Sequence, residues 1–303
     1  MTSLSLWSLA FLLFAFTTPT LLHAEVSQPF ITTFDSVEAG LSVLQSRGFD
    51  VNLTIDHQAN AQSVDLTLRS TTVLFGQPPK LPSQLSKAIH TYLPTLAIDL
   101  PEKILLFQDA DNKINVKTNT LGYLLDRHLP SFLSQLKGKF RTALGAVPIT
   151  LGLPVDNGLI ETESSNTVET TLLKIETALV EAGFRIPIIY DFSSAGAQKK
   201  LIIFGNPAVG TQLMQINQEI GIDLPQKFLI YESSPNALLS MIGRRFGIGK
   251  GSGLDMFGGR KKVVIVHNDP RFIARRAGVE GADMLLGNIG MALQRFANIG
   301  AAA

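Results

Sequence analysis

The segment Leu201–Glu232 reads LIIFGNPAVGTQLMQINQEIGIDLPQKFLIYE, and its order of patterns recurs elsewhere in the chain. In it an apolar run ends at Gly-Asn-Pro, a helical pattern follows, and Asp-Leu-Pro introduces a second apolar run. Thr72–Asp109, with the sequence TVLFGQPPKLPSQLSKAIHTYLPTLAIDLPEKILLFQD, has the same order: Phe-Gly-x-Pro, then Ile-Asp-Leu-Pro-x-Lys, then an apolar run. This similarity indicates a tandem duplication, so a fold predicted for one repeat applies to both.

The first repeat, residues 28–147, alternates strand and helix patterns. Ser36 is placed to cap a helix that Gly48 ends, and alternating apolar residues over 49–55 predict the next strand. Strands are also predicted at 73–75, 104–107 and 114–118, and helices from about residue 83 and over 121–144. This order predicts an α+β fold of two tandem two-layer domains, each an antiparallel sheet with helices on one face. A linker over 148–165 follows.

The second repeat, residues 166–300, differs from the first by an insertion. Equivalent residues are 124 positions apart at Asp99 and Asp223, but 149 positions apart in the strand that ends at Asn268. The second repeat has therefore gained 25 residues inside a hairpin that is tight in the first. We assign this insertion to residues 233–260.

The first 24 residues have the features of a secretory signal. Leu4–Phe16 is apolar, Pro19 interrupts the run, and Ala24 ends a segment that resembles a cleavage site. An uncleaved anchor is the alternative, although the run is shorter than the roughly 20 residues that span a bilayer. We predict cleavage after Ala24 and a periplasmic or secreted location.

The composition excludes several classes of function. Lys and Arg number 26 and Asp and Glu 25, so the chain has no bulk attraction for nucleic acid, and none is predicted as a partner. Without cysteine there is no disulfide, thiolate metal site or cysteine nucleophile. No Gly-x-Ser-x-Gly motif occurs, and the glycine-rich stretch before Lys250 lacks the spacing of a phosphate-binding loop. No cofactor is predicted.

Several short motifs resemble the domain of unknown function 302 family, present twice in the chain. The matching residues are Asp56-His57 with Ala61, Phe75-Gly76-x-Pro78 and Asp99-Leu100-Pro101 in the first repeat, and Phe204-Gly205-Asn206-Pro207, Asp223-Leu224-Pro225 and Asn268-Asp269-Pro270 before Arg275-Arg276 in the second. The resemblance implies a TATA-binding-protein-like topology and no established activity. The second repeat departs from the family pattern because it lacks the Asp-His element and carries the insertion.

The Asp-Leu-Pro-x-Lys motifs supply the first candidate binding residues. Asp99 and Asp223 can accept hydrogen bonds from backbone N–H groups where the chain turns into a strand. Lys103 and Lys227 can face solvent or pair with these carboxylates. A binding role for the two Asp/Lys pairs is the alternative to this purely structural role.

His57 is the best single candidate for chemistry, because an imidazole can act as a base or a metal ligand near neutral pH. Asp56 can orient its ring only if the backbone bends, since adjacent strand residues point to opposite faces. His90 and His128 are distant in sequence, so a metal site would depend on the fold, and none is predicted. Satisfied surface or boundary histidines are the simpler interpretation.

The insertion carries a local basic patch. Arg244, Arg245 and Lys250 are near the apolar Met241 and Phe246. Such a combination suits contact with anionic lipid or an acidic partner. A solvated loop is the alternative.

We therefore predict an exported, non-enzymatic protein that binds a small apolar ligand or a protein partner in the cell envelope, with a peripheral membrane contact through the insertion. The duplication, the missing catalytic motifs and the apolar composition favour this hypothesis. The rival hypothesis is an enzyme, or a metal- or haem-dependent redox accessory, centred on His57 with Asp56, Asp99 and Lys103.

Overall fold

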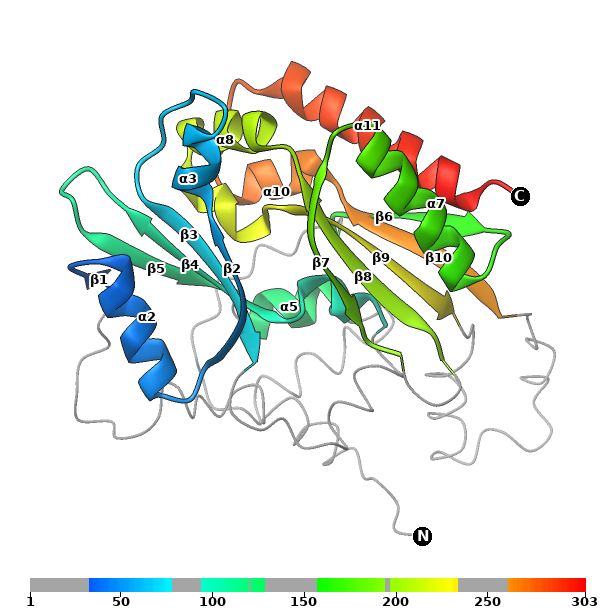
Figure 1. Ribbon diagram of the computed structural model, residues 1–303, viewed down its shortest axis with the longest axis horizontal. Coiled ribbons are helices and arrows are strands. Elements are labelled where there is room, and N and C mark those ends of the chain that lie inside the picture. Colours follow the sequence, from blue (N-terminus) through cyan, green and yellow to red (C-terminus); the bar gives the residue numbers. More distant parts are fainter. Residues whose placement is uncertain (1–32, 78–93, 120, 129–156, 194–196, 234–260) are drawn as a thin grey trace, which may run out of the picture. The chain divides into compact units, whose positions relative to one another are not determined.

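The computed structural model describes residues 33–77, 94–119, 121–128, 157–193, 197–233 and 261–303 (Figure 1). These residues form two five-stranded antiparallel sheets with helices, which confirms the predicted α+β class and the duplication. The predicted signal segment and the insertion residues 234–260 lie outside the described residues.

The first sheet has the strand order β1-β5-β4-β3-β2. Its strands are β1 (Thr33–Phe34), β2 (Asp50–Asp56), β3 (Thr71–Gln77), β4 (Glu102–Gln108) and β5 (Ile114–Thr118). Its helical elements are α2 (Val37–Ser46), α3 (His57–Gln62), the 3-10 helix η1 (Pro94–Asp99) and α5 (Leu121–His128). The predicted segment 121–144 is helical as far as His128, and its remainder lies outside the described residues, as does the helix predicted from residue 83.

The second sheet repeats this order as β6-β10-β9-β8-β7. Its strands are β6 (Leu159–Ser164), β7 (Arg185–Asp191), β8 (Lys199–Gly205), β9 (Gln226–Ser233) and β10 (Lys262–Asn268). Its helical elements are α7 (Val168–Glu181), α8 (Pro207–Ile216), the 3-10 helix η3 (Gln218–Asp223), α10 (Pro270–Arg276) and α11 (Asp283–Ala301). Lys262 pairs with Ser233, so the insertion connects two paired strands, as the sequence offsets indicate.

The second sheet begins earlier than the sequence indicates. β6 lies inside the segment 148–165 that we predicted as a linker, and all six of its residues pair with β10. Its sequence, LIETES, has apolar residues only at its first two positions, although its burial alternates between half-buried and exposed from Ile160 to Ser164. The strand forms because β10 supplies an edge to pair with, which is information that the local pattern does not carry.

Local signals explain the first helix of each repeat. The Ser36 side chain accepts from the Ala39 backbone N–H at 3.1 Å, and the Thr167 side chain accepts from Thr170 at 3.2 Å. The chain leaves each helix through a glycine with positive φ, 84° at Gly48 and 77° at Gly183. These turns return the chain into β2 and β7.

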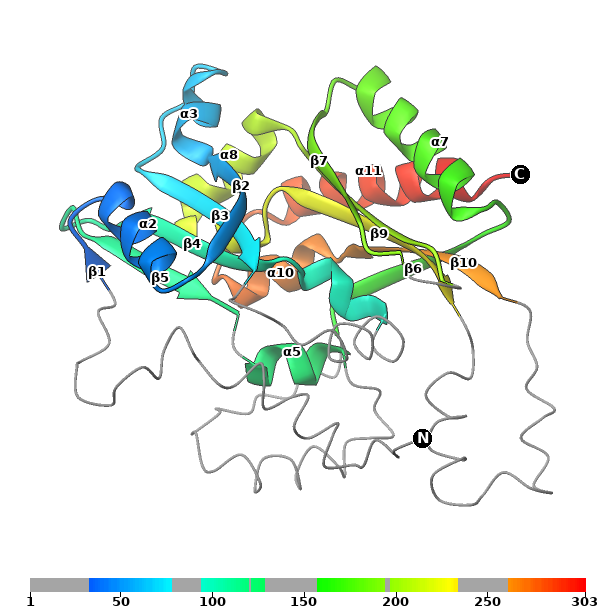
Figure 2. The same cartoon turned by 60° about the horizontal axis from the view of Figure 1, so that its bottom comes forward.

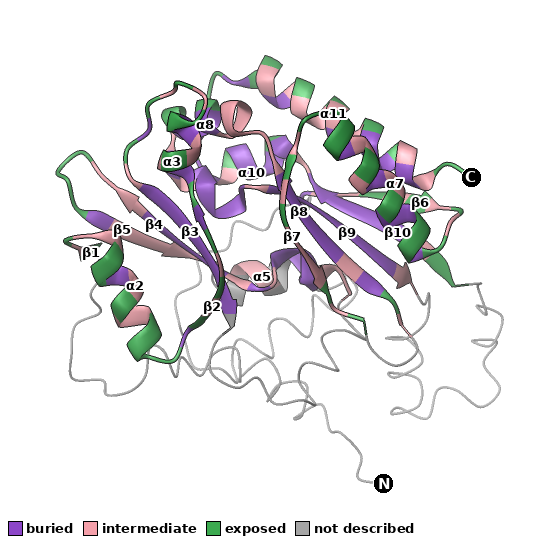
Figure 3. Ribbon diagram, viewed as in Figure 1, coloured by how far each residue is buried: buried purple, intermediate pink, exposed green. Residues whose placement is uncertain are grey.

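Each sheet has an apolar core between one face and its own helices (Figure 3). In the first, α2 packs on a cluster that includes Leu74, Ile104 and Leu106. In the second, α7 and α11 pack on a cluster that includes Phe204, Phe228 and Ile265. α2 in the first sheet, and α7 with α11 in the second, therefore each cover one face, as predicted.

The chain divides into two compact units that do not coincide with the two repeats. The first unit comprises Met1–Leu85, Asp99–Asn157 and Pro207–Ile222, and the second comprises Ser86–Ile98, Gly158–Asn206 and Asp223–Ala303. Each unit therefore contains a segment from the other repeat.

In the first unit the exchanged segment 207–222 packs on the first sheet. α8 lies against α3, as Figures 1 and 2 show. Gln218 Nε2 donates to Thr71 Oγ1 at 2.6 Å, and Glu219 forms an ion pair with Lys117. A Cβ atom added at Gly221 would lie 3.0 Å from Leu105 Cδ1, so this glycine allows close packing on the strand. Thr71 and Leu105 lie on the face of the sheet opposite to α2.

Among the described residues, no helix combines the length and the hydropathy that a bilayer span requires.

Candidate functional site

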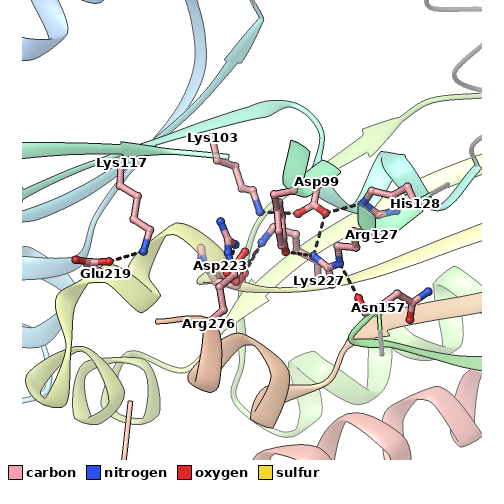
Figure 4. Close-up of polar contacts among 12 residues, drawn as sticks. Asp99, Lys103, Lys117, Arg127, His128, Asn157, Glu219, Asp223, Lys227 and Arg276 are labelled. Carbon is pink, nitrogen blue, oxygen red and sulfur yellow. Dashed lines mark hydrogen bonds and ion pairs between the residues drawn. The ribbon is translucent and has the colours of Figure 1, made fainter. Parts of the chain in front are cut away.

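Asp99 is the centre of a buried polar group in the first unit. It is the last residue of η1, and the cis peptide Leu100–Pro101 leads from it into β4. Its carboxylate accepts from three side chains (Figure 4). Lys103 Nζ donates to Oδ1 at 2.9 Å, and Arg127 Nη1 and His128 Nε2 lie 2.9 and 2.8 Å from Oδ2. We call these four residues the first ion group.

Two elements position the cations of the first ion group. Lys103 is the second residue of β4, four positions after Asp99. Arg127 and His128 are the last two residues of α5. Arg127 is oriented further by Nε, which donates to the Asn157 carbonyl at 3.0 Å, and by Nη1, which lies 2.7 Å from the Tyr123 hydroxyl.

Burial and charge act in opposite directions on Asp99. Burial by itself raises the pKa of this carboxyl, but Arg127, Lys103 and the hydrogen bond from His128 outweigh burial and hold the pKa well below its usual range. Asp99 is therefore ionised at physiological pH.

His128 has the opposite balance. Burial lowers the pKa of this imidazole, and the hydrogen bond and negative charge of Asp99 do not fully offset it. The ring is neutral at pH 7, and because a carboxylate only accepts, its Nε2 carries the proton and donates.

The second unit contains an equivalent set, Asp223, Lys227 and Arg276, which we call the second ion group. Arg276 Nη1 donates to Asp223 Oδ2 at 2.7 Å (Figure 4). Lys227 Nζ donates to the carbonyl oxygens of Asp223 and Pro225 at 3.2 and 3.1 Å. Asp223 also precedes a cis Leu–Pro bond.

The two ion groups differ in burial and composition. The Arg127 side chain is 1% exposed, whereas that of Arg276 is 18% exposed. Ala277 occupies the position of His128 in the second repeat, because both arginines and both following residues are 149 positions apart. The first group therefore has one more titratable donor.

Sequence reasoning found the aspartates and lysines of both groups but not Arg127. Its expectation of surface or boundary histidines is wrong for His57 and His128, which are both buried. The alternative that Lys103 and Lys227 face solvent is wrong, since their exposed fractions are 1% and 0%. The signal that identifies Arg127 was present in the sequence. The offset of 149 relates it to Arg276, which lies in a family motif.

Asp56 and His57 are placed apart from the first ion group. Asp56 caps α3, and its Oδ1 accepts from the Ala59 backbone N–H at 2.9 Å. The strand register places Asp56 opposite Thr72, whereas Lys103 pairs with Phe75. Three residues of strand correspond to about 10 Å, so the structure does not bring His57 to Asp99 and Lys103.

His57 itself is 5% exposed at the start of α3. The described residues contain no group of three or more His, Cys, Asp or Glu side chains that could hold a metal ion. His90 and the insertion residues Arg244, Arg245 and Lys250 lie outside the described residues.

Comparison with known proteins gives similarities over part of the chain. It is 32% identical over 130 residues to "Fluoride-specific ion channel FluC 1" of Brucella suis and to the FluC 1 protein of Brucella abortus. The match covers 40% of this chain and 41% and 38% of the two channel proteins, so the chain spans about two fifths of the length of these relatives.

A solved structure, the uncharacterized conserved protein DUF302 from Bacillus stearothermophilus, is 12% identical in sequence. It aligns with 47% of this chain and 97% of its own, with a TM-score of 0.35. The profile of the family described as "Domain of unknown function DUF302" matches residues 22–147 and 160–242, one segment in each repeat. The chain therefore belongs to the DUF302 family, with two tandem copies of its domain.

Proposed function

We propose that this protein is an exported, non-enzymatic binding protein of the cell envelope, and that the two ion groups are its binding residues. The family to which it belongs has no known function, so the proposal rests on this chain. The observation that carries it is an Asp–Lys–Arg set at equivalent positions of both repeats, in which the aspartate and the lysine are buried.

Stability alone is a poor explanation for such groups. Burying an ion pair removes both charges from water, and well-packed apolar residues of similar volume are often as stable or more stable. Buried charged groups with displaced pKa values concentrate at functional sites. Their presence at equivalent positions of two otherwise diverged repeats favours a binding role.

The ionisation of Asp99 favours binding over proton transfer. An efficient general base has a pKa near the working pH. The pKa of Asp99 is held well below its usual range, and three donors already contact its oxygens. Asp99 is thus suited to holding the cations in place and is a weak base.

Two observations support a location in the envelope. The N-terminal 24 residues have the pattern of a cleaved signal. The Brucella relatives, matched over about two fifths of their length, are named as ion channels, and an ion channel is a membrane protein. We propose a protein partner at the membrane, with Arg244, Arg245 and Lys250 contacting anionic lipid.

Native mass spectrometry of the protein purified from its own host tests this proposal. We expect a mature chain that starts at Glu25 and retains a small ligand or a partner. Lys103→Met should lose that bound species, while the exposed Lys113→Met should keep it. A wild-type protein without any retained species contradicts the binding proposal, and an uncleaved N-terminus contradicts cleavage.

The rival hypothesis, an enzyme or a metal- or haem-dependent accessory centred on His57, is tested by a measurement of metal content. If the protein is a metal- or haem-dependent accessory, purified material contains stoichiometric metal that His57→Ala removes. On our proposal the metal content is substoichiometric, and His57→Ala leaves the retained species unchanged.

A further inference from the structure

We infer that the outer side of α7 and α11 binds a second copy of this chain, with α7 of each copy packed on α11 of the other. We call this surface the dimer face. Its apolar residues are Leu173 and Val180 on α7 and Met284 and Met291 on α11. The inference does not rest on the two ion groups, so its failure leaves the binding proposal unchanged.

The two helices form one antiparallel layer within the second unit (Figure 1). A Cβ atom added at Gly300 of α11 would lie 2.6 Å from Ile175 and 3.3 Å from Thr171 of α7. The Ser165 backbone N–H, just before α7, donates to the Ala301 carbonyl at 3.3 Å. The end of α11 therefore lies beside the beginning of α7.

The inner side of each helix supplies the core of the second sheet. Its buried apolar residues include Leu172, Ile175 and Leu179 of α7 and Leu286, Leu293 and Phe296 of α11. The apolar residues of the dimer face lie on the other side of each helix, where they add nothing to this core.

The outer side has an apolar set of its own. Leu173 and Val180 are 64% and 61% exposed, and Met284 and Met291 are 83% and 67% exposed. The members of each pair are seven positions apart, so they lie on one side of their helix, two turns from each other. Of the five large apolar side chains that are exposed in the described part of the chain, four belong to this layer. Such a group is typical of a protein–protein contact.

The charges of the layer identify the partner. α7 contains three glutamates and one lysine, and that lysine, Lys174, donates to the Ala302 carbonyl at 2.7 Å. α10 and α11 together contain four arginines and one aspartate. Arg295 is exposed one turn after Met291, and Arg271 of α10 lies 3.6 Å from the position of a Cβ atom at Gly287. One side of the layer is therefore acidic and the other basic, so a second copy is complementary to it.

Symmetry then determines how two copies meet. A two-fold axis that runs parallel to the helices places the acidic α7 of each copy on the basic α11 of the other. A two-fold axis perpendicular to the helices would place α7 on α7, where like charges repel. In the first arrangement Met291, nine residues before Gly300, is level with about residue 182 of the partner and packs beside Val180.

The layer is large enough for a dimer of moderate affinity. α7 has 14 residues and α11 has 19, which correspond to lengths of about 21 and 28 Å. Two adjacent helices of this length present roughly 500 Å² per copy, at the lower end of specific interfaces. An anionic bilayer is a poorer partner than a second copy, because the glutamates of α7 would be repelled by it.

Sedimentation equilibrium of the full mature chain at about 1 to 100 μM tests the inference, since an interface of this size suits micromolar affinity. We expect a monomer at the low end and twice its mass at the high end. A monomer at every concentration overturns the inference, whether or not it binds lipid vesicles.

Two substitutions at one exposed position test the arrangement. Met291→Glu puts a negative charge against the acidic α7 of the partner and should raise the dissociation constant about tenfold or more. Met291→Lys removes the same apolar contact but faces glutamates, so it should weaken the dimer less. Ile216→Glu, at an exposed position of α8, is the control and should leave the dissociation constant unchanged. An unchanged dimer in Met291→Glu, or equal weakening by both Met291 variants, overturns the inference.

Cross-linking places the contact directly, because the chain contains no cysteine. Chains carrying Val180→Cys and chains carrying Met291→Cys are mixed and treated with a short bifunctional thiol reagent. The mixture should give a cross-linked dimer, and each variant alone should remain uncross-linked. Cross-linking of Met291→Cys chains alone, or none in the mixture, overturns the pairing of α7 with α11.

Discussion

Arg127 and Arg276, 149 positions apart, make the same contact in the two repeats. Each donates from Nη1 to Oδ2 of the aspartate that precedes a cis Leu–Pro bond in its own repeat, at 2.9 and 2.7 Å. Arg127 belongs to α5 and Arg276 to α10, the first helix after the hairpin in each repeat. The duplication thus preserved an ionic contact between parts of the repeat that are distant in sequence.

Asp99→Asn should destabilise the protein by about 3 kcal/mol, because it removes the buried carboxylate that Lys103 and Arg127 both contact. Urea unfolding measures this change. The double variant Asp99→Asn/Lys103→Met should recover part of the loss, since it also removes one of the two cations.

The exposed pair of Asp35 and Lys113 is the control for that change. Its side chains are 92% and 56% exposed, so Asp35→Asn should cost less than about 1 kcal/mol. Equal decreases in the free energy of unfolding for Asp99→Asn and Asp35→Asn would show that burial does not strengthen the interactions of the first ion group.

His128 should make stability depend on pH. Its folded pKa lies below the usual histidine value because of burial, so the unfolded chain binds the proton more tightly. The contribution of His128 to the free energy of unfolding is complete above its pKa in the unfolded chain, about 6.5. It is lost as the pH falls below that value toward the lower pKa of the folded state. The groups that act on it are Asp99, Arg127 and Lys103.

The free energy of unfolding should therefore decrease as the pH is lowered from 7.5 to 5.5. The decrease should be smaller for His128→Gln than for the wild-type protein. His267, whose pKa burial also lowers, retains its own part of the dependence in that variant. Identical slopes for wild type and His128→Gln would contradict the assignment.

Gly76→Ala and Gly205→Ala form a matched pair, because both glycines occupy the same position of the Phe-Gly-x-Pro motif. A Cβ at Gly76 would lie 2.4 Å from the Asp50 carbonyl oxygen and 2.5 Å from the Phe49 ring. At Gly205 the nearest atom is Pro225 Cβ at 3.1 Å. We expect a loss of about 2 to 3 kcal/mol for Gly76→Ala and under about 1 kcal/mol for Gly205→Ala.

Chemical unfolding of the Gly76→Ala and Gly205→Ala variants measures both losses of stability. Equal losses would mean that the motif needs glycine for a reason other than the close approach of Asp50 and Phe49.

The exchanged segment predicts that the repeats do not fold alone. A fragment of residues 25–157 lacks 207–222, which contacts Thr71 and the buried Leu105 in the first unit. Produced alone, it should bind a hydrophobic dye and aggregate because this face is exposed. Produced together with residues 158–303, it should elute as a stable one-to-one complex. Two soluble, independently cooperative fragments would contradict this prediction.

The basic insertion predicts a contact with anionic membranes. The wild-type chain should sediment with phosphatidylserine vesicles. A chain with residues 236–260 deleted, or a variant with Arg244, Arg245 and Lys250 changed to Gln, should stay in the supernatant. Neutral vesicles are the control. If the wild-type and deleted chains sediment equally, the insertion has no such role.

Local patterns were sufficient for much of the architecture. Helix caps at Ser36 and Thr167, the glycines that end those helices and the alternating strands all act over a few residues, so the sequence predicts the element order. The duplication also located the insertion, because an offset between equivalent residues needs no structure. β6 was missed because its pairing with β10 stabilises a pattern that is weak by itself.

The sequence by itself determined that the chain is a duplicated α+β protein with distinctive Asp-Leu-Pro-x-Lys turns. Only the tertiary structure decided that those lysines are buried, that Arg127 and His128 converge on Asp99, and that 207–222 belongs to the first unit. The physical reason is that burial and ion pairing depend on which distant segments pack together. Residues 28 or more positions apart share no local pattern that specifies their contact.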